Sequence, residues 1–230
     1  MFQGLLGRCQ AQVTERRKFR FKNKLVSLDS TVIDLCATVF DWAEFRRTKG
    51  AVKLHCLLDH DGYLPSVVVI TDGKRHDVRV ARTLRLDPGT VVVIDRSYVD
   101  YAWFGDVTAQ DVFFVTRLKS HTTYKVVERR PVPERGGILR DELIELTTWD
   151  AANKCAFRLR RVEIDNPDKD GTLKFLTNHL TLGPSPTTTP VATSICCFES
   201  PSDRTLGREE KLPGSGSFSG SPRDCRSSTP

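Results

Sequence analysis

The feature of this chain that most constrains its fold is a short apolar run that ends at a carboxylate. Residues 91–94 are Val-Val-Val-Ile, and Pro88-Gly89 sets a turn just before them. A run of β-branched residues bounded in this way predicts a strand that is buried on both faces of a sheet. Asp95 follows at once, and its charge is costly there unless a metal ion, an arginine or hydrogen bonds compensate it.

A second stretch has the same form. Residues 23–29 predict another apolar strand, which delivers Asp29 at its end. We therefore expect the two strands to lie side by side, with Asp29 and Asp95 sharing a divalent metal ion. The alternative is that both aspartates are turn formers or helix caps, which are common roles for aspartate at the end of a strand.

The composition is that of an ordinary soluble protein, with 39% hydrophobic and 28% charged residues in 230. No window approaches 18 apolar residues, so no membrane span is expected, and the first apolar run is too short for a secretory signal. The seven cysteines are odd in number and form no Cys-x-x-Cys pair. A zinc site or disulfide framework is therefore not expected, and a reducing cytoplasm fits best.

The net charge of +6 is unevenly distributed. The last 47 residues contain five basic and five acidic residues, so the whole excess lies in residues 1–183, most densely at 16–24 and 46–49. A basic globular part favours a polyanionic partner, nucleic acid first. A solvated basic surface would account for the charge equally well.

Between residues 23 and 117 the pattern predicts an α/β fold with a mixed sheet. After the strand at 23–29, residues 32–44 show no clean period and predict a loop with some helical turn. Strands at 51–59 and 64–71 form a hairpin. A helix at 78–86, capped by Asp77, leads to the strand before Asp95, and a helix at 98–108 leads to a last strand at 111–117.

The pattern changes after residue 118. Alternating stretches at 124–129, 141–147, 155–164 and 172–177 predict strands with one exposed face. From residue 184 proline and serine dominate, which predicts disorder. The chain therefore divides into a basic N-terminal arm (1–22), an α/β core (23–118), a β-rich insertion (119–183) and a disordered tail (184–230).

Four segments, at 27–31, 71–77, 93–101 and 113–119, together resemble the DDE transposases. The resemblance is closest to bacterial insertion-sequence transposases of the IS-four type, and it spans about residues 20–183. It implies a ribonuclease H-like fold with a β-rich insertion after the fifth core strand. The strand order predicted from the residues agrees with that fold.

The resemblance also implies a function. In the family, two aspartates that match Asp29 and Asp95, together with a later glutamate, hold two Mg²⁺ or Mn²⁺ ions. Metals about 4 Å apart activate the attacking oxygen and stabilise the leaving one, first for strand nicking and then for strand transfer. The implied partners are DNA, as transposon ends and target, and a second copy or an intact transposase. The implied location is the bacterial cytoplasm, with no membrane.

Other positions carry weaker expectations. By resemblance, Arg96, Tyr98, Arg117 and Lys119 are candidates for DNA binding, although a solvated strand end would explain Arg117 and Lys119 and core packing would explain Tyr98. Trp149 matches a region where some relatives stack an aromatic ring on an extruded base. We expect it instead to cover a hairpin. His76 is expected to be a loop or cap residue rather than a ligand.

The chain also departs from the family. The third acid of the family lies after the insertion, in a helix with the pattern Tyr-x2-Arg-x3-Glu-x6-Lys. Here no tyrosine follows Tyr124, and the three glutamates of the tail, Glu199, Glu209 and Glu210, lack that spacing. The family-like sequence stops near Gly183, and the residues after it resemble the translation of an altered reading frame.

These observations predict a truncated, inactive transposase that retains two of three catalytic acids and has no third. Two alternatives remain open. One is a non-catalytic DNA-binding remnant that occupies transposon ends or interferes with intact transposase. The other is a metal-dependent nuclease of the same fold whose third ligand comes from elsewhere.

Overall fold

The computed structural model describes residues 22–35, 44–46, 49–134, 137–165 and 171–181, with three isolated positions near the N-terminus. Nearly all of the predicted N-terminal arm and the whole predicted disordered tail lie outside these residues. Within them, no helix has both the length and the apolar character that a membrane crossing requires.

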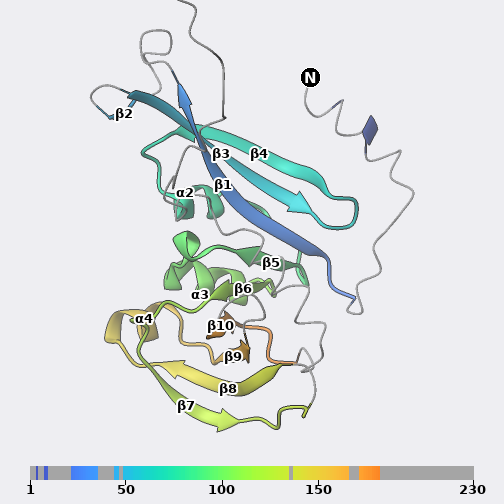
Figure 1. The fold of residues 1–230 in the computed structure, drawn as a ribbon, viewed down its shortest axis with the longest axis vertical. Helices are drawn as coiled ribbons and strands as arrows, with labels where there is room; N and C mark the ends of the chain where they lie inside the picture. Colours follow the sequence, from blue (N-terminus) through green and yellow to red (C-terminus); the bar gives the residue numbers. More distant parts are fainter. Residues whose placement is uncertain are drawn as a thin grey trace, which may run out of the picture. The chain divides into compact units, whose positions relative to one another are not determined.

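The first half of the chain alternates strands and short helices (Figure 1). Its elements are β1 (Leu25–Leu35), β2 (Glu44–Arg46), β3 (Lys49–Asp59), β4 (Leu64–Asp72), α2 (Asp77–Ala81), β5 (Val91–Ile94), the 3₁₀ turn η1 (Arg96–Tyr98), α3 (Tyr101–Ala109) and β6 (Phe113–Arg117). The second half contains β7 (Tyr124–Arg129), β8 (Ile138–Leu146), α4 (Trp149–Lys154), β9 (Leu159–Asp165) and β10 (Thr172–Thr177).

All the described strands belong to one mixed sheet, in the order β2-β3-β1-β5-β6-β10-β9-β8-β7, and β4 pairs with β3 outside this path. The centre, β1-β5-β6, is parallel, and β3 and β4 are antiparallel additions to it. Strand β10 pairs antiparallel with β6, so the second half of the chain continues the same sheet. The predicted fold class, an α/β mixed sheet of the ribonuclease H-like type, is confirmed.

The two faces of the central sheet carry separate apolar clusters. On one face, residues of β1, β5 and β6 such as Leu28, Ile94 and Phe114 pack with Phe104 and Trp103 of α3. On the other face, Leu25, Val91, Val93 and Val115 form a second cluster with Leu173 and Phe175 of β10. Strand β5 is buried at all four positions, as a two-faced strand in the middle of a sheet must be.

Four sequence predictions were wrong in detail. Strand β1 does not end at Asp29 but continues to Leu35, because its pairing with β3 continues to Gly50. The region predicted as a loop from residue 32 is therefore partly strand, and residues 36–43 lie outside the described part of the chain. Helix α2 stops at Ala81 rather than at residue 86, where the Thr83 hydroxyl donates to the Val80 carbonyl at 2.7 Å and closes a tighter turn.

The other two errors concern the second half of the chain. Residues 150–153, predicted as a turn, belong to the short helix α4. Strands β8 and β9 were expected to have one exposed face, yet most of their residues are buried. Several of their charged residues are buried, because arginines of β9 pair with carboxylates of β8.

Candidate active site

The strand register brings the two predicted acids together. In the parallel pair β1–β5, Leu28 lies opposite Ile94, so the next residues on the two strands are Asp29 and Asp95. Neighbouring residues in a parallel ladder point to the same face, which here is the face of Leu25, Val91 and Val93. The prediction that the two strands lie side by side is confirmed by this pairing.

The two carboxylates repel each other and are only weakly compensated. Burial raises the pKa of Asp29, and the charges of Asp95 and Asp77 raise it further, against one hydrogen bond from the Ser30 backbone. Asp95 accepts a long hydrogen bond of 3.3 Å from the Ser97 amide. Among the described residues, none of the charges that shift the pKa of Asp29 belongs to a lysine, arginine or histidine.

The chemistry of this pair suits a hard divalent cation. Two partly buried carboxylates provide oxygen ligands, which Mg²⁺ and Mn²⁺ prefer. A cation between them would also relieve the repulsion that raises the pKa of Asp29. The described residues contain no group of three or more His, Cys, Asp or Glu placed to hold a metal ion, so the pair by itself is an incomplete ligand set.

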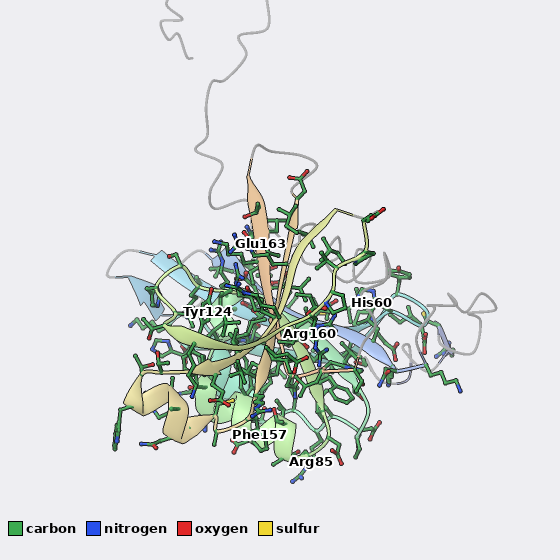
Figure 2. All side chains as sticks on the ribbon, turned by 90° about the horizontal axis from the view of Figure 1, so that it is seen from below. His60, Arg85, Tyr124, Phe157, Arg160 and Glu163 are labelled. Carbon is green, nitrogen blue, oxygen red and sulfur yellow. The ribbon has the colours of Figure 1, made fainter. Side chains whose placement is uncertain are left out.

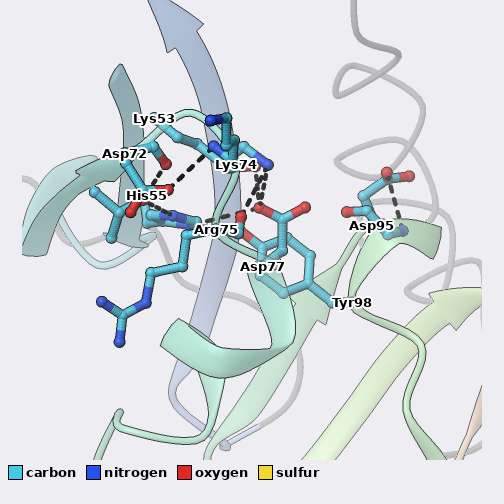
Figure 3. Close-up of polar contacts among 11 residues, drawn as sticks. Lys53, His55, Asp72, Lys74, Arg75, Asp77, Asp95 and Tyr98 are labelled. Atoms are coloured by element: carbon cyan, nitrogen blue, oxygen red, sulfur yellow. Dashed lines mark hydrogen bonds and ion pairs between the residues drawn. The ribbon is translucent and has the colours of Figure 1, made fainter. Parts of the chain in front are cut away.

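A polar cluster surrounds Asp77 (Figure 3), on the face of the sheet that Ser30 and His55 share and that alternates with the face of Asp29. Its centre is Asp77, the first residue of α2, whose Oδ1 accepts a hydrogen bond of 2.9 Å from the Ser30 hydroxyl and lies 3.1 Å from Lys53 Nζ. His55 is 1% exposed, and its Nδ1 lies 3.4 Å from the Tyr98 hydroxyl and 3.7 Å from Asp77 Oδ1. Its Nε2 lies 3.1 Å from the hydroxyl of Thr71.

Sequence reasoning missed this cluster. It assigned Asp77 to the cap of a helix, but the N-cap position is taken by His76, and the Asp77 carboxylate faces β1 and β3 instead. A signal was present, because Ser30 and His55 are polar residues in the middle of apolar strands, directly opposite each other in the β1–β3 register. Such residues need buried partners, and Asp77 is the acid that the chain places next to them.

The four candidates for DNA binding fall into two kinds of place. Arg96 is exposed directly after Asp95, and Arg117 and Lys119 are partly exposed at the end of β6. The β5–β6 pairing ends at Val93 and Val115, which lie two residues before Asp95 and Arg117 on the two neighbouring strands. Tyr98, by contrast, is 0% exposed. It packs in the core and its hydroxyl contacts His55, so it is not accessible to DNA.

Trp149 also differs from its prediction. It was expected to cover a hairpin, but it is 81% exposed at the start of α4. An indole with so much surface in water contributes little to the core. The Trp149 ring is therefore accessible to a partner, whereas the buried Tyr98 ring is not.

A second group of charges lies within β7–β10, where Figure 2 labels Arg160 and Glu163 together with Tyr124. Arg160 donates two hydrogen bonds to Asp141, at 2.8 and 2.7 Å, and both side chains are almost completely buried. Arg161 pairs with Glu142 at 2.5 Å and with Glu163, and its guanidinium lies 5.7 Å from the centre of the Tyr124 ring. Burial alone would lower the pKa of Arg161, but Tyr124 and the two carboxylates raise it above its usual value.

The chain was also compared with known proteins. Residues 20–175 match the family model described as "Transposase DDE domain". The chain is similar to "Putative transposase y4zB" of Sinorhizobium fredii, with 28% identity over 182 residues, or 77% of this chain and 50% of that protein. It is also similar to "Probable transposase for insertion sequence element IS5377" of Geobacillus stearothermophilus, with 32% identity over 117 residues, or 51% of this chain and 30% of that protein. The chain spans half or less of the length of these curated relatives.

Proposed function

Because the chain belongs to the family of transposase DDE domains, we propose that Asp29 and Asp95 are ligands for divalent metal ions that serve DNA cleavage and joining. The observation that carries the proposal is the β1–β5 register, which makes the two acids neighbours on parallel strands. The raised pKa of Asp29 adds to it, because a bound cation would offset the repulsion from Asp95 and Asp77 that contributes to that shift.

The protein's own contribution is to hold the two carboxylates at a fixed place on the sheet. The Ser97 amide orients Asp95, and the Ser30 amide orients Asp29, so each acid keeps oxygen lone pairs for a metal ion. Two Mg²⁺ or Mn²⁺ ions, when bound, supply activation of the attacking oxygen and stabilisation of the leaving oxygen at phosphorus.

DNA is the proposed substrate, both as transposon ends and as target. Arg96 and Arg117 flank the Asp29/Asp95 pair along the chain and across the sheet, and Lys119 follows two residues later. Cations beside acidic metal ligands suit a phosphodiester backbone, since phosphate contacts position nucleic acid without reading its sequence. Trp149 offers a stacking surface for an unpaired base at a separate place on the chain.

The proposal includes a limit on activity. Among the 230 residues, no glutamate has the spacing that the family uses for its third acid. We therefore expect this polypeptide to bind metal and DNA without completing strand transfer. In this form it would act as a DNA-binding remnant that occupies transposon ends or assembles with intact transposase, which is the second candidate function.

The test compares DNA binding with DNA cleavage for the full chain on end DNA of the insertion sequence. We expect binding that weakens steeply with salt, because phosphate contacts release counterions, and no nicking in Mg²⁺ or Mn²⁺. If the parent chain nicks DNA and Asp95→Ala does not, the proposed metal site would be supported and the proposed inactivity would be overturned. Absence of any binding at low salt would overturn the proposal for DNA.

A further inference from the structure

The Asp77 cluster occupies the reverse side of the strands that carry the two acids. Consecutive residues of a strand point to opposite faces, so Ser30 faces away from Asp29. That reverse face is otherwise apolar, with Val26, Leu28 and Ile94 packed against helices. A buried polar cluster in such surroundings is costly unless its members satisfy one another, so its position calls for an explanation.

We propose that Asp77 is a positioning residue that sets the spacing of Asp29 and Asp95 for a divalent cation. Its carboxylate holds Ser30, the residue after Asp29, at 2.9 Å. Through His55, which lies 3.7 Å from Asp77 and 3.4 Å from the Tyr98 hydroxyl, it also reaches the turn that begins at Asp95. This inference rests on the proposed function, since it concerns the same pair of acids.

Lys53 fixes the carboxylate of Asp77 in place. Its ammonium group lies 3.1 Å from Asp77 Oδ1, and both side chains are mostly buried, at 16% and 12% exposed. The contacts of Ser30 and Lys53 converge on the same oxygen, Oδ1, and the neutral His55 ring lies 3.7 Å from it. A carboxylate already committed to these partners is poorly suited to be a metal ligand itself, which favours a positioning role.

His55 fits the role of a neutral connector. Burial lowers its pKa, so the imidazole is neutral at pH 7 and has one donor and one acceptor nitrogen. One nitrogen faces the Tyr98 hydroxyl and the other faces Thr71 of β4. The contacts of the cluster therefore connect β1, β3, β4, α2 and η1. Two of these elements border the acids, since β1 carries Asp29 and η1 follows Asp95.

The direct test measures Mn²⁺ binding to the full chain by calorimetry, with melting temperature as a check on folding. Ser30→Ala removes one uncharged contact, and we expect the Kd for Mn²⁺ to rise about tenfold, as is typical when a partner behind a metal ligand is lost. Asp77→Asn should raise the Kd at least as much. Ser66→Ala is the matched control, because the Ser66 hydroxyl donates a hydrogen bond of 3.0 Å to the Leu57 carbonyl and is not one of the Asp77 partners described above. The Kd of this variant for Mn²⁺ should not change.

A second variant separates positioning from simple charge. Lys53→Met removes a positive charge near the site, so an effect of charge alone would tighten Mn²⁺ binding. Positioning predicts weaker binding, since Asp77 loses the partner that fixes it. Asp100→Asn is the control for Asp77→Asn, because Asp100 is another carboxylate near a helix start and pairs with Arg82 at 2.9 Å.

The outcomes distinguish this inference from the proposed function. Unchanged Mn²⁺ binding in Ser30→Ala, or tighter binding in Lys53→Met, would overturn the positioning role even if Asp29→Asn and Asp95→Asn abolish binding. Binding that survives Asp29→Asn and Asp95→Asn would instead overturn the proposed metal site. Should Asp77→Asn fail to fold, Ser30→Ala still decides the question.

Discussion

Two groups of acids in this protein have opposite electrostatic surroundings. In β7–β10, Asp141, Glu142 and Glu163 each meet an arginine inside the sheet, and hydrogen bonds from Thr172 and Arg161 outweigh burial to lower the pKa of Glu163. Beside the paired strands β1 and β5, Asp29 and Asp95 lie next to each other, and burial raises the pKa of Asp29.

The difference separates a structural use of charge from a functional one. Arg160 and Asp141 satisfy each other with bidentate geometry, so these two charges are compensated within the sheet. The Asp29/Asp95 pair is left under repulsion, as functional sites often are at some cost in stability. This contrast between paired and repelling acids predicts measurable differences in stability, metal binding and pH dependence.

The largest effect is expected from breaking the buried Arg160–Asp141 pair. Asp141→Ala leaves a guanidinium that is 2% exposed without its carboxylate, which should cost about 3–5 kcal/mol of the free energy of unfolding. Chemical denaturation measures this cost. Replacing both partners by apolar residues, Asp141→Leu with Arg160→Met, should restore most of the loss, since such pairs contribute little net stability.

The control for that prediction is an acid of the same strand at the surface. Glu145 pairs with Lys125 at 2.8 Å and with Arg158 at 3.2 Å, and its side chain is 32% exposed. Glu145→Ala should change stability little, because exposed ion pairs contribute little. Equal losses in Asp141→Ala and Glu145→Ala would show that burial is not what makes the Arg160–Asp141 pair important.

Metal binding should stabilise the protein only through the Asp29/Asp95 pair. At a free Mn²⁺ concentration 100 times the Kd, linkage predicts a gain of about 2.7 kcal/mol, visible as a higher melting temperature. Asp29→Asn and Asp95→Asn should lose the gain. Asp150→Asn, at a side chain that is 66% exposed and paired with Lys154, should keep it. The same gain in all variants would place the metal elsewhere.

Without metal, removing one of the repelling charges should make the protein more stable. Asp29→Asn removes a charge that burial and Asp95 both disfavour, and keeps an oxygen for the Ser30 amide. A gain of roughly 0.5–2 kcal/mol is expected, the usual size when the electrostatic cost of a functional site is relieved. Chemical denaturation in the presence of a chelator measures this gain. A variant less stable than the parent would contradict the prediction.

The smallest effect is a difference in pH dependence between the two groups of acids. The pKa of Asp29 is raised from 3.8, so its contribution to stability is present below that value and is lost as the pH rises through the folded pKa. The pKa of Glu163 is lowered from 4.5, so its contribution is present above that value and is lost as the pH falls through the folded pKa.

Two variants make this pH dependence measurable. The stability advantage of Asp29→Asn should grow as the pH rises above 3.8, at roughly the slope of a single proton, and level off once the pH passes the folded pKa of Asp29. The stability deficit of Glu163→Gln should shrink as the pH falls below 4.5, the unfolded value. If the stability of both variants relative to the parent changed in the same direction with pH, the contrast between the two groups of acids would be wrong.

The sequence predicted the sheet well where local pattern and burial agree. The run at 91–94 has a composition that only a two-faced strand accommodates, and β5 has those bounds. The acid after each apolar run was the signal for the Asp29/Asp95 pair, and the β1–β5 register makes the two residues neighbours. Their role as metal ligands stays a prediction.

The sequence failed where pairing between distant strands decides the structure. Val32 and Ile33 are exposed by 43% and 44%, so burial does not hold this part of the strand, and pairing with β3 extends β1 to Leu35. The β-branched residues Thr31, Val32 and Ile33 were a local signal for this extension that the sequence prediction did not use. Arg160 and Arg161 likewise suggest a surface strand until Asp141 and Glu142 are known to lie on the neighbouring strand. Periodicity cannot show partners that are brought together by register.

The central claim is that Asp29 and Asp95 hold the same cation, and a double-mutant cycle of Mn²⁺ binding tests it most directly. Calorimetric titration of the parent, Asp29→Asn, Asp95→Asn and the double variant gives the coupling between the two acids. The account predicts that each single variant already loses most of the affinity, so the double variant is hardly worse. Losses that simply add, or a double variant that binds Mn²⁺ as the parent does, would contradict a shared site.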